Sequence, residues 1–290
     1  MQKLECDILF LGLGPIGAGF ASELMKIGQK ICVISDFESY LLPSASHNEN
    51  KMIRLNWDAA LGREIYADTS YVLWKSLPFE RSNGSEIGRW LKSSQFLTPK
   101  INHFSSSSVY ANLKDEIYFE DSKIDLDSQH LNSKQSIEKY LAELSTIKST
   151  QITNYRISNI YGGNLNSGFI NESLLNLKIG APIRVFKDFD IVRDYLEIQD
   201  LISALLELHA INTSEGSLNI STGFGESISA ILQIFENSLH FTPEVLKIEH
   251  TTVIQKKSVL SCDKLRGIIQ WSPKALGNVL PSMIDFSLKP

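Results

Sequence analysis

Three glycines near the start of the chain are spaced so that they could bind phosphate. Gly12, Gly14 and Gly17 form a G-x-G-x-x-G turn between the apolar run Ile8–Leu11 and a helical pattern over Ala18–Ile27. In such a turn the first glycine lets the chain turn tightly, the second lets a pyrophosphate approach the backbone, and the third lets the helix pack against the strand. The free N–H groups at the start of the helix favour an anionic ligand. The turn therefore predicts a site for a dinucleotide.

A carboxylate, Asp36, follows the second apolar run, at the position where it could hydrogen-bond the ribose of a bound dinucleotide. The second apolar run, Ile31–Ile34, is followed by Asp36, about 20 residues past the glycines. Asp36 can accept hydrogen bonds from both ribose hydroxyls and would repel a 2′-phosphate, and Phe37–Ser39 contains no Arg or Lys. We therefore expect NAD rather than NADP. The alternative is a glycine-rich turn of another α/β fold, with no ligand.

Apolar runs of strand type alternate with helical patterns along the rest of the chain. Strands are expected at residues 52–57, 71–74, 101–104, 152–160, 183–186, 191–198 and 218–220. Helices are expected at residues 59–69, 82–93, 127–144, 169–180, 200–211 (with Asp200 as N-cap), 228–239 and 276–286. Alternation of this kind is typical of an α/β fold with a doubly wound parallel sheet.

Composition excludes several classes of partner. The 290 residues are 43% hydrophobic and 21% charged, which is ordinary for a globular protein, and no stretch reaches the ~18 apolar residues of a membrane span. The formal net charge of −5, without blocks of like charge, argues against nucleic acid or an anionic membrane as the main partner. Three scattered cysteines and six histidines show no disulfide framework or metal-ligand spacing, so we expect no metal and a cytoplasmic location.

Six short stretches occur in a characteristic order along nearly the whole chain. They are Gly12–Gly17, Phe104–Tyr110, Ser133–Glu138, Arg156–Gly162, Val192–Leu201 and, in the tail, Asp263–Leu265 with Trp271–Pro273. In this order and spacing they resemble the extended short-chain dehydrogenase/reductase family, in particular its NAD-dependent sugar-nucleotide epimerases and dehydratases.

The resemblance implies a two-part organisation. A dinucleotide-binding Rossmann domain is expected over residues 1–165 and a mainly substrate-binding lobe over residues 166–290, with a segment near 187–225 returning to the Rossmann sheet. It also implies NAD as cofactor, a nucleotide-sugar substrate and a homodimer built on a four-helix bundle. Tyr140, Leu141 and Leu144 could face that bundle, although a core-facing stripe would look the same.

The resemblance also assigns catalytic residues. In the family a Ser or Thr holds the reacting oxygen, a Tyr acts as general acid/base, and a Lys four residues later lowers the pKa of that Tyr and holds the nicotinamide ribose. The Ser matches Ser106 and the Lys matches Lys134, but the Tyr position holds His130. A nearby ammonium favours neutral imidazole, which can still act as a general base near its ordinary pKa of about 6.5. Alternatively, His130 is a surface or pocket residue, and acid/base chemistry is impaired or done elsewhere.

Two further residues match substrate-binding positions of the family. Arg193 resembles the arginine that pairs with the nucleotide diphosphate, and a guanidinium suits phosphate geometry; the alternative is a surface ion pair with Asp194. Asn159 resembles the substrate-binding Asn after the sixth strand, and the alternative is a cap at the strand end.

These residues lead to two hypotheses. The first is an enzyme that transiently oxidises a ring carbon of a nucleotide-sugar; Ser107 and Ser108, in place of an acidic pair, favour an epimerase or reductase over a dehydratase. The second is a catalytically impaired NAD-binding protein that acts as a sensor or partner.

The sequence therefore assigns three groups of site residues. The expected catalytic residues are Ser106, His130 and Lys134. The expected cofactor-binding residues are Gly12, Gly14, Pro15, Ile16, Gly17, Asp36 and Lys134, and the expected substrate-binding residues are Asn159 and Arg193.

Overall fold

The computed structural model describes most of the chain, in several segments. These are residues 3–11, 15–34, 53–55, 64–72, 96–97, 99–110, 117–122, 124, 133–148, 150–163, 165, 167–186, 191–249 and 255–287. The chain divides into two compact units, each made of interleaved segments. Unit 1 comprises Met1–Val109, Lys123–Arg156 and Leu205–Leu218, and unit 2 comprises Tyr110–Ser122, Ile157–Ala204 and Asn219–Pro290.

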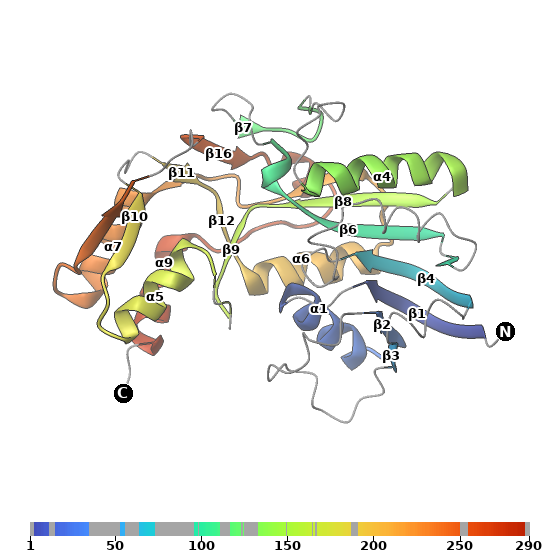
Figure 1. Cartoon of the computed structure of the whole chain (residues 1–290), viewed down its shortest axis with the longest axis horizontal. Helices are drawn as coiled ribbons and strands as arrows, with labels where there is room; N and C mark the ends of the chain where they lie inside the picture. The colour runs from blue at the N-terminus through green and yellow to red at the C-terminus, as the bar shows by residue number, and fades with distance from the viewer. Residues whose placement is uncertain are drawn as a thin grey trace. The chain divides into compact units, whose positions relative to one another are not determined.

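An eight-stranded sheet forms the framework of unit 1 (Figure 1). Its strands are β1 (Lys3–Leu11), β2 (Ile31–Ile34), β3 (Ile53–Leu55), β4 (Glu64–Val72), β5 (Phe96–Leu97), β6 (Lys100–Ser106), β8 (Gln151–Ile157) and β13 (Gly216–Ile220). They lie in the order β13-β8-β6-β4-β1-β2-β3, with β5 beside β4. The pairs β2–β3, β1–β2, β1–β4 and β4–β6 are parallel. The doubly wound parallel sheet is thus confirmed, and its strand order reverses between β1 and β4.

Helices cover both faces of this sheet. On one face, Phe20 of α1 (Pro15–Lys26) makes edge contacts with Phe10 of β1 and Phe104 of β6, at centroid distances of 6.2 and 6.4 Å. His209 of α6 (Ile198–Ala210) contacts the same ring. Neighbouring strand residues point to opposite faces. Helix α4 (Ser133–Lys148), which contacts Ser105, therefore covers the other face.

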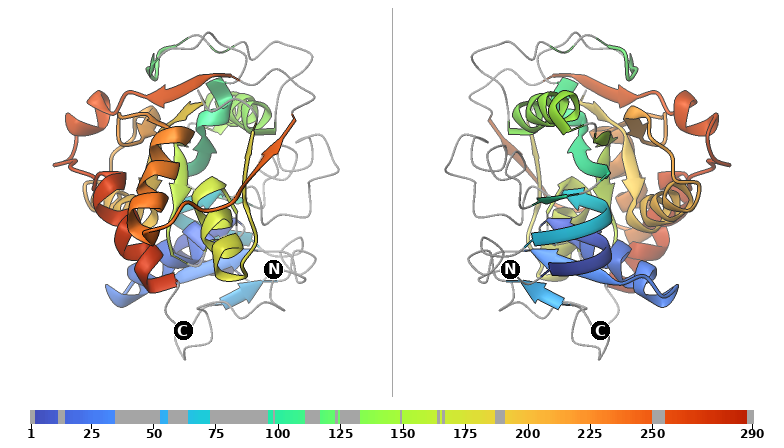
Figure 2. Two further views of the ribbon diagram at one scale, coloured as in Figure 1. Left: turned by 90° about the vertical axis from the view of Figure 1, so that its left-hand side faces the viewer. Right: turned by 90° about the vertical axis from the view of Figure 1, so that its right-hand side faces the viewer.

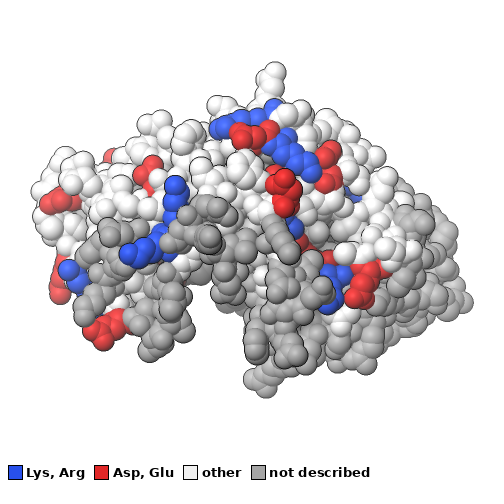
Figure 3. Space-filling model, turned by 90° about the horizontal axis from the view of Figure 1, so that it is seen from above, with Lys and Arg blue, Asp and Glu red and all other residues white. Residues whose placement is uncertain are grey.

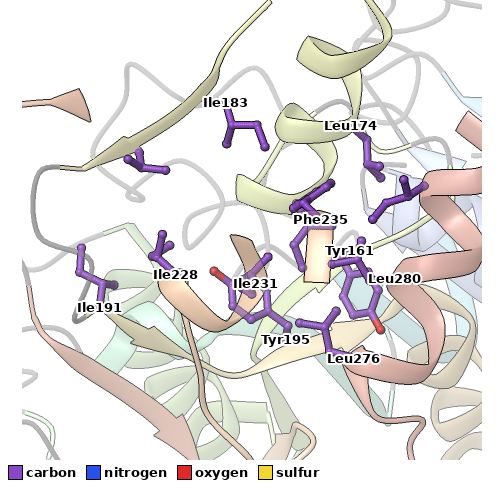
Figure 4. Close-up of a cluster of buried hydrophobic side chains, with 13 residues drawn as sticks. Tyr161, Leu174, Ile183, Ile191, Tyr195, Ile228, Ile231, Phe235, Leu276 and Leu280 are labelled. Atoms are coloured by element: carbon purple, nitrogen blue, oxygen red, sulfur yellow. The ribbon is translucent and has the colours of Figure 1, made fainter. Parts of the chain in front are cut away.

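Unit 2 has its own hydrophobic core. It gathers side chains from α5 (Phe169–Lys178), α7 (Ile228–Leu239) and α9 (Leu276–Ser287) over the parallel pair β10 (Ile183–Phe186) and β15 (Val245–Ile248). Helices α7 and α9 lie side by side (Figures 1 and 2). Fully buried Ile231, Phe235 and Leu280 lie at the centre of the cluster drawn in Figure 4. An amphipathic stripe on each helix thus builds a second core beside a short sheet.

Short strands of unit 2 carry the segments that matter for the site. The order β14-β11-β16-β7 joins β14 (Glu226–Ser227), β11 (Val192–Arg193), β16 (Lys257–Leu260) and β7 (Ile117–Tyr118). A separate pair joins β9 (Asn159–Tyr161) to β12 (Tyr195–Glu197). A 3-10 turn over Ser107–Tyr110 follows β6, and α8 (Asp263–Arg266) follows β16.

Four expectations about local structure were wrong, and one of them is the strand expected over residues 191–198, which is interrupted at Asp194. The helix expected over residues 59–69 is replaced from Glu64 onward by β4, because eight residue pairs with β1 outweigh the helix propensity of that segment. The strand expected over residues 152–160 is interrupted at Ser158. Helix α6 begins at Ile198, so Asp200 lies in its first turn instead of capping it. The helix expected at residues 82–93 lies outside the described residues.

Candidate functional site

In the sequence, the glycine motif falls between the end of β1 and the first residues of α1. Strand β1 ends at Leu11 and α1 begins at Pro15 and continues through Ile16, while Gly17 is buried in the helix. Leu11 is therefore the carboxyl end of β1, beside the reversal of strand order, and ligands of open α/β sheets bind at such strand ends. Gly12 and Gly14 themselves, and Asp36 beyond the end of β2, lie outside the described residues.

Ser106 is the last residue of β6. Its side chain is partly exposed, and its Oγ accepts a hydrogen bond from Ser108 N at 3.1 Å. The 3-10 turn over Ser107–Tyr110 begins at the next residue. The serine hydroxyl is therefore held at the carboxyl end of a parallel strand of the sheet.

Lys134 lies in the first turn of α4 and contacts this strand end directly. Its Nζ donates to Phe104 O at 2.7 Å, two residues before Ser106. The next residue on the helix, Gln135, donates from Nε2 to Val109 O at 2.9 Å. These two bonds flank Ser106, so the structure brings Ser106 and Lys134 to the same strand end. His130 lies outside the described residues.

A buried ion pair anchors α4 one turn further along. Glu138 accepts from Arg156 Nη2 at 2.8 Å and from Arg156 Nε at 3.2 Å, and both side chains are buried. Ser105 Oγ also donates to Glu138 Oε1, at 2.5 Å. A bidentate arginine–carboxylate pair has a defined geometry. The pair therefore ties the helix that carries Lys134 to β8, and the Ser105 bond ties the same carboxylate to β6, the strand that carries Ser106.

His103 is a polar residue near the site that sequence reasoning missed. It is fully buried on β6, its Nδ1 lies 2.9 Å from Asn154 Oδ1, and its Nε2 has no partner among the described residues. Burial first, and then the Lys134 ammonium, lower the pKa of His103 to about 3. The ring is therefore neutral and cannot replace an acid/base. A histidine inside an apolar strand pattern is a weak signal, because such residues are commonly satisfied in a core.

Asn159 lies on β9 in unit 2, after the strand that ends at Ile157. Its backbone N and its side-chain Nδ2 both donate to Asp194 O, at 3.0 and 3.1 Å. The side chain is half-buried. The side-chain amide thus links β9 to the residue before β12. This is the kind of bond expected if Asn159 caps a strand end. The side chain is still partly accessible to solvent.

Arg193 lies on β11 of the same unit, and its guanidinium bonds to backbone carbonyls. Its Nη1 donates to Val192 O at 2.8 Å and to Lys256 O at 3.3 Å, and its Nη2 donates to Gln255 O at 2.6 Å. The carboxylate of Asp194 instead accepts from the turn at Thr222. The alternative of an Arg193–Asp194 ion pair is therefore wrong. Asp194 is thus next to Arg193 in the chain and is hydrogen-bonded through its carbonyl to Asn159.

The described residues also include charged side chains and possible metal ligands. On the face drawn in Figure 3, acidic and basic side chains of the described residues are interspersed. Over the described segments, no cluster of three or more His, Cys, Asp or Glu could hold a metal ion. No helix among those segments is both long and apolar enough to cross a membrane.

One family of known proteins matches part of the sequence. Residues 89–221 match the NAD dependent epimerase/dehydratase family, a range that includes Ser106, Lys134, Asn159 and Arg193. No curated protein sequence is similar enough to the chain to count as a relative.

Solved structures share the fold along almost the whole chain. The UDP-glucuronic acid 4-epimerase of Bacillus cereus, solved with UDP-glucuronic acid and NAD, is 19% identical, with 99% of each chain covered and a TM-score of 0.75. The UDP-glucose 4-epimerase of Thermotoga maritima, solved with UDP-glucose, is 18% identical, with 98% of each chain covered and a TM-score of 0.73. The dTDP-glucose 4,6-dehydratase of Bacillus anthracis, solved with NAD, is 17% identical, covering 98% of this chain and 96% of its own, with a TM-score of 0.77.

The resemblance seen in the sequence motifs is thereby confirmed. Over residues 89–221 the chain carries the sequence pattern of the NAD dependent epimerase/dehydratase family, on a fold that it shares from end to end with sugar-nucleotide epimerases and dehydratases.

Proposed function

We propose that this protein is an NAD-dependent epimerase or reductase that acts on a nucleotide-activated sugar by transient oxidation at a ring carbon. The observation that carries this proposal is the bond from Lys134 Nζ to Phe104 O, two residues before Ser106 on the same strand. The serine residues at positions 107 and 108, where a dehydratase would have an acidic pair, favour these reactions over dehydration.

The residues at the glycine turn fit NAD. Gly17 is buried in α1, which begins at Pro15, and the strand order reverses beside β1. Residues 12–17 would hold the pyrophosphate and Asp36 the adenosine ribose. Bound NAD would accept a hydride from the sugar and return it. Lys134 would hold the nicotinamide ribose, and Ser106 would hydrogen-bond the sugar oxygen whose proton is removed.

The proton itself would go to His130, and this assignment has a direct test. If His130 is the base, His130→Ala should lower turnover by about a hundredfold or more, and His130→Tyr should keep or raise activity. Turnover would be measured with UDP-glucose and UDP-glucuronic acid, together with the absorbance of enzyme-bound NADH. Unchanged turnover in His130→Ala would remove this histidine from the mechanism.

The second candidate is a catalytically impaired NAD-binding protein that acts as a sensor or partner. The observation that favours it is His130 in place of the family tyrosine. In that case the wild type binds NAD but forms no NADH with any nucleotide-sugar, and only His130→Tyr gains activity. Binding of neither NAD nor a nucleotide-sugar by the wild type would contradict both candidates.

Substrate binding would depend on Arg193. Loss of one charge-assisted contact to a diphosphate costs about 1.5–3 kcal/mol, which is roughly tenfold to a hundredfold in affinity. Arg193→Ala should therefore weaken UDP-sugar binding in titration calorimetry and leave NAD binding unchanged. Equal weakening of both ligands would indicate a folding defect instead.

Homodimerisation and a cytoplasmic location remain part of the proposal. The three cysteines are buried and free of disulfides, which fits a reducing compartment. Leu141 and Leu144 are buried within the single chain, so they belong to its core, whereas Tyr140 is half-buried. Light scattering of the purified protein would measure its oligomeric state, and a monomeric mass would contradict the dimer.

A further inference from the structure

Asp194 is a buried carboxylate that holds a turn of unit 2. It lies between β11 and β12, with only 1% of the residue exposed. Its Oδ1 accepts from Thr222 N at 3.0 Å and from Thr222 Oγ1 at 2.9 Å, and its Oδ2 accepts from Gly223 N at 2.9 Å. Bonds to an ionised acceptor are stronger than neutral ones. The carboxylate therefore fixes the turn that follows β13.

The backbone of Asp194 is hydrogen-bonded to β9 and β16. Its carbonyl accepts both bonds from Asn159, and its N–H donates to Ser258 O at 3.2 Å. Arg193 is the preceding residue, and its guanidinium bonds to the carbonyls before β16. One residue thus joins the two proposed substrate-binding residues to the turn at Thr222.

The turn has little freedom to rearrange. Gly223 has a φ of +82°, and a Cβ added there would lie 2.9 Å from Cys262 Sγ. Thr222 Oγ1 accepts from Phe224 N at 3.1 Å, so the hydroxyl that donates to Asp194 also closes the turn. The rigid turn at Thr222 and Gly223 therefore fixes the position of the Asp194 carboxylate. Through Asp194, it also restrains β11, the strand that carries Arg193.

From this arrangement we infer that Asp194 and Thr222 are positioning residues for nucleotide-sugar binding: their hydrogen bonds hold Arg193 and Asn159 in the geometry that receives the substrate. This inference rests on the proposed function, because it takes those two residues as the ones that bind the substrate. A purely structural role would lower stability without a selective effect on one ligand.

Thr222→Val is the decisive variant, because it removes the hydroxyl but keeps the volume and the backbone N–H. Calorimetry would give the Kd for UDP-glucose, UDP-glucuronic acid and NAD. We expect Thr222→Val to weaken the UDP-sugars about tenfold and to leave the Kd for NAD within about threefold. Thr222→Ser, which keeps the hydroxyl, should restore UDP-sugar affinity to within about threefold of wild type.

A matched control removes an equivalent hydroxyl in unit 1. Thr213 Oγ1 donates to Glu215 Oε1 at 3.0 Å, so Thr213→Val also deletes a threonine–carboxylate bond, and it should leave UDP-sugar affinity unchanged. Wild-type affinity in Thr222→Val, or equal weakening of NAD and UDP-sugars, would overturn the positioning role while the proposed function stands. A wild type that binds no UDP-sugar would overturn both.

Discussion

The ion pair between Glu138 and Arg156 is a buried constraint on the helix that carries Lys134. Both side chains are buried, and Ser105 adds a third bond to the same carboxylate. Removing one partner of such a pair leaves an uncompensated charge in the interior, whereas replacing both by apolar residues costs much less.

We therefore predict that Glu138→Gln lowers the free energy of unfolding by about 3–5 kcal/mol. The double variant Glu138→Met, Arg156→Met should lose less than Glu138→Gln, because neither residue is then charged. Urea unfolding of the three proteins measures both values. A double variant less stable than the single would show that the pair contributes net stability beyond satisfying its own charges.

Asp194 gives a second prediction at the residue scale, on pH. Burial is the largest cause that raises the pKa of Asp194 to about 6, from an ordinary value near 4. The folded protein then binds this proton more tightly than the unfolded chain. The stability contributed by the group is fully present below about pH 4 and is lost as pH rises through 6.

Asp194→Asn removes this titration. Relative to the variant, the wild type should lose on the order of 3 kcal/mol of unfolding free energy between pH 4 and pH 7. Denaturant unfolding at several pH values gives the two curves. Parallel curves over this range would mean that the carboxylate titrates near its ordinary pKa.

At the scale of elements, α7 shows how a local signal fixes a helix start. Ser227 precedes α7 in extended conformation, and its Oγ accepts from Ala230 N at 3.1 Å. This is the bond of an N-cap, and its loss typically costs about 1 kcal/mol. The helix packs against α9 in the core of unit 2, so fraying at this end would loosen that contact.

Ser227→Ala should accordingly lower the free energy of unfolding by about 1 kcal/mol. Ser238→Ala, in the last turn of the same helix, is the matched control and should stay within about 0.5 kcal/mol of wild type. Thermal unfolding followed by circular dichroism compares them. Equal effects of the two substitutions would argue against a capping role.

At the scale of the whole molecule, cofactor choice should appear as a difference in stability. A ligand that binds only the folded state at 100 times its Kd adds about 2.7 kcal/mol. NAD should therefore raise the Tm more than NADP at equal concentration, because Asp36 would repel the 2′-phosphate. In Asp36→Ala the NAD effect should shrink more than the NADP effect. A larger shift with NADP in the wild type would contradict the assignment of NAD.

The sequence by itself determined the order and type of most elements and the candidate residues of the site. The strand expected over residues 101–104, which lies within β6, the helix expected over residues 228–239 and the alternation of strands and helices depend on nearest neighbours in the chain. Such signals are readable because backbone sterics, capping and hydrophobic periodicity act over a few residues.

Only the tertiary structure decided how distant residues pair. It made Glu64–Val72 a strand, because a central position between β1 and β6 outweighs local helix propensity. In the folded chain the Asp194 carboxylate accepts a hydrogen bond from Thr222 and does not pair with Arg193. Glu138 pairs with Arg156. These partners lie 28 and 18 residues apart. The chain must close those loops before the bonds form, so their pairing is a property of the packed fold that no local pattern encodes.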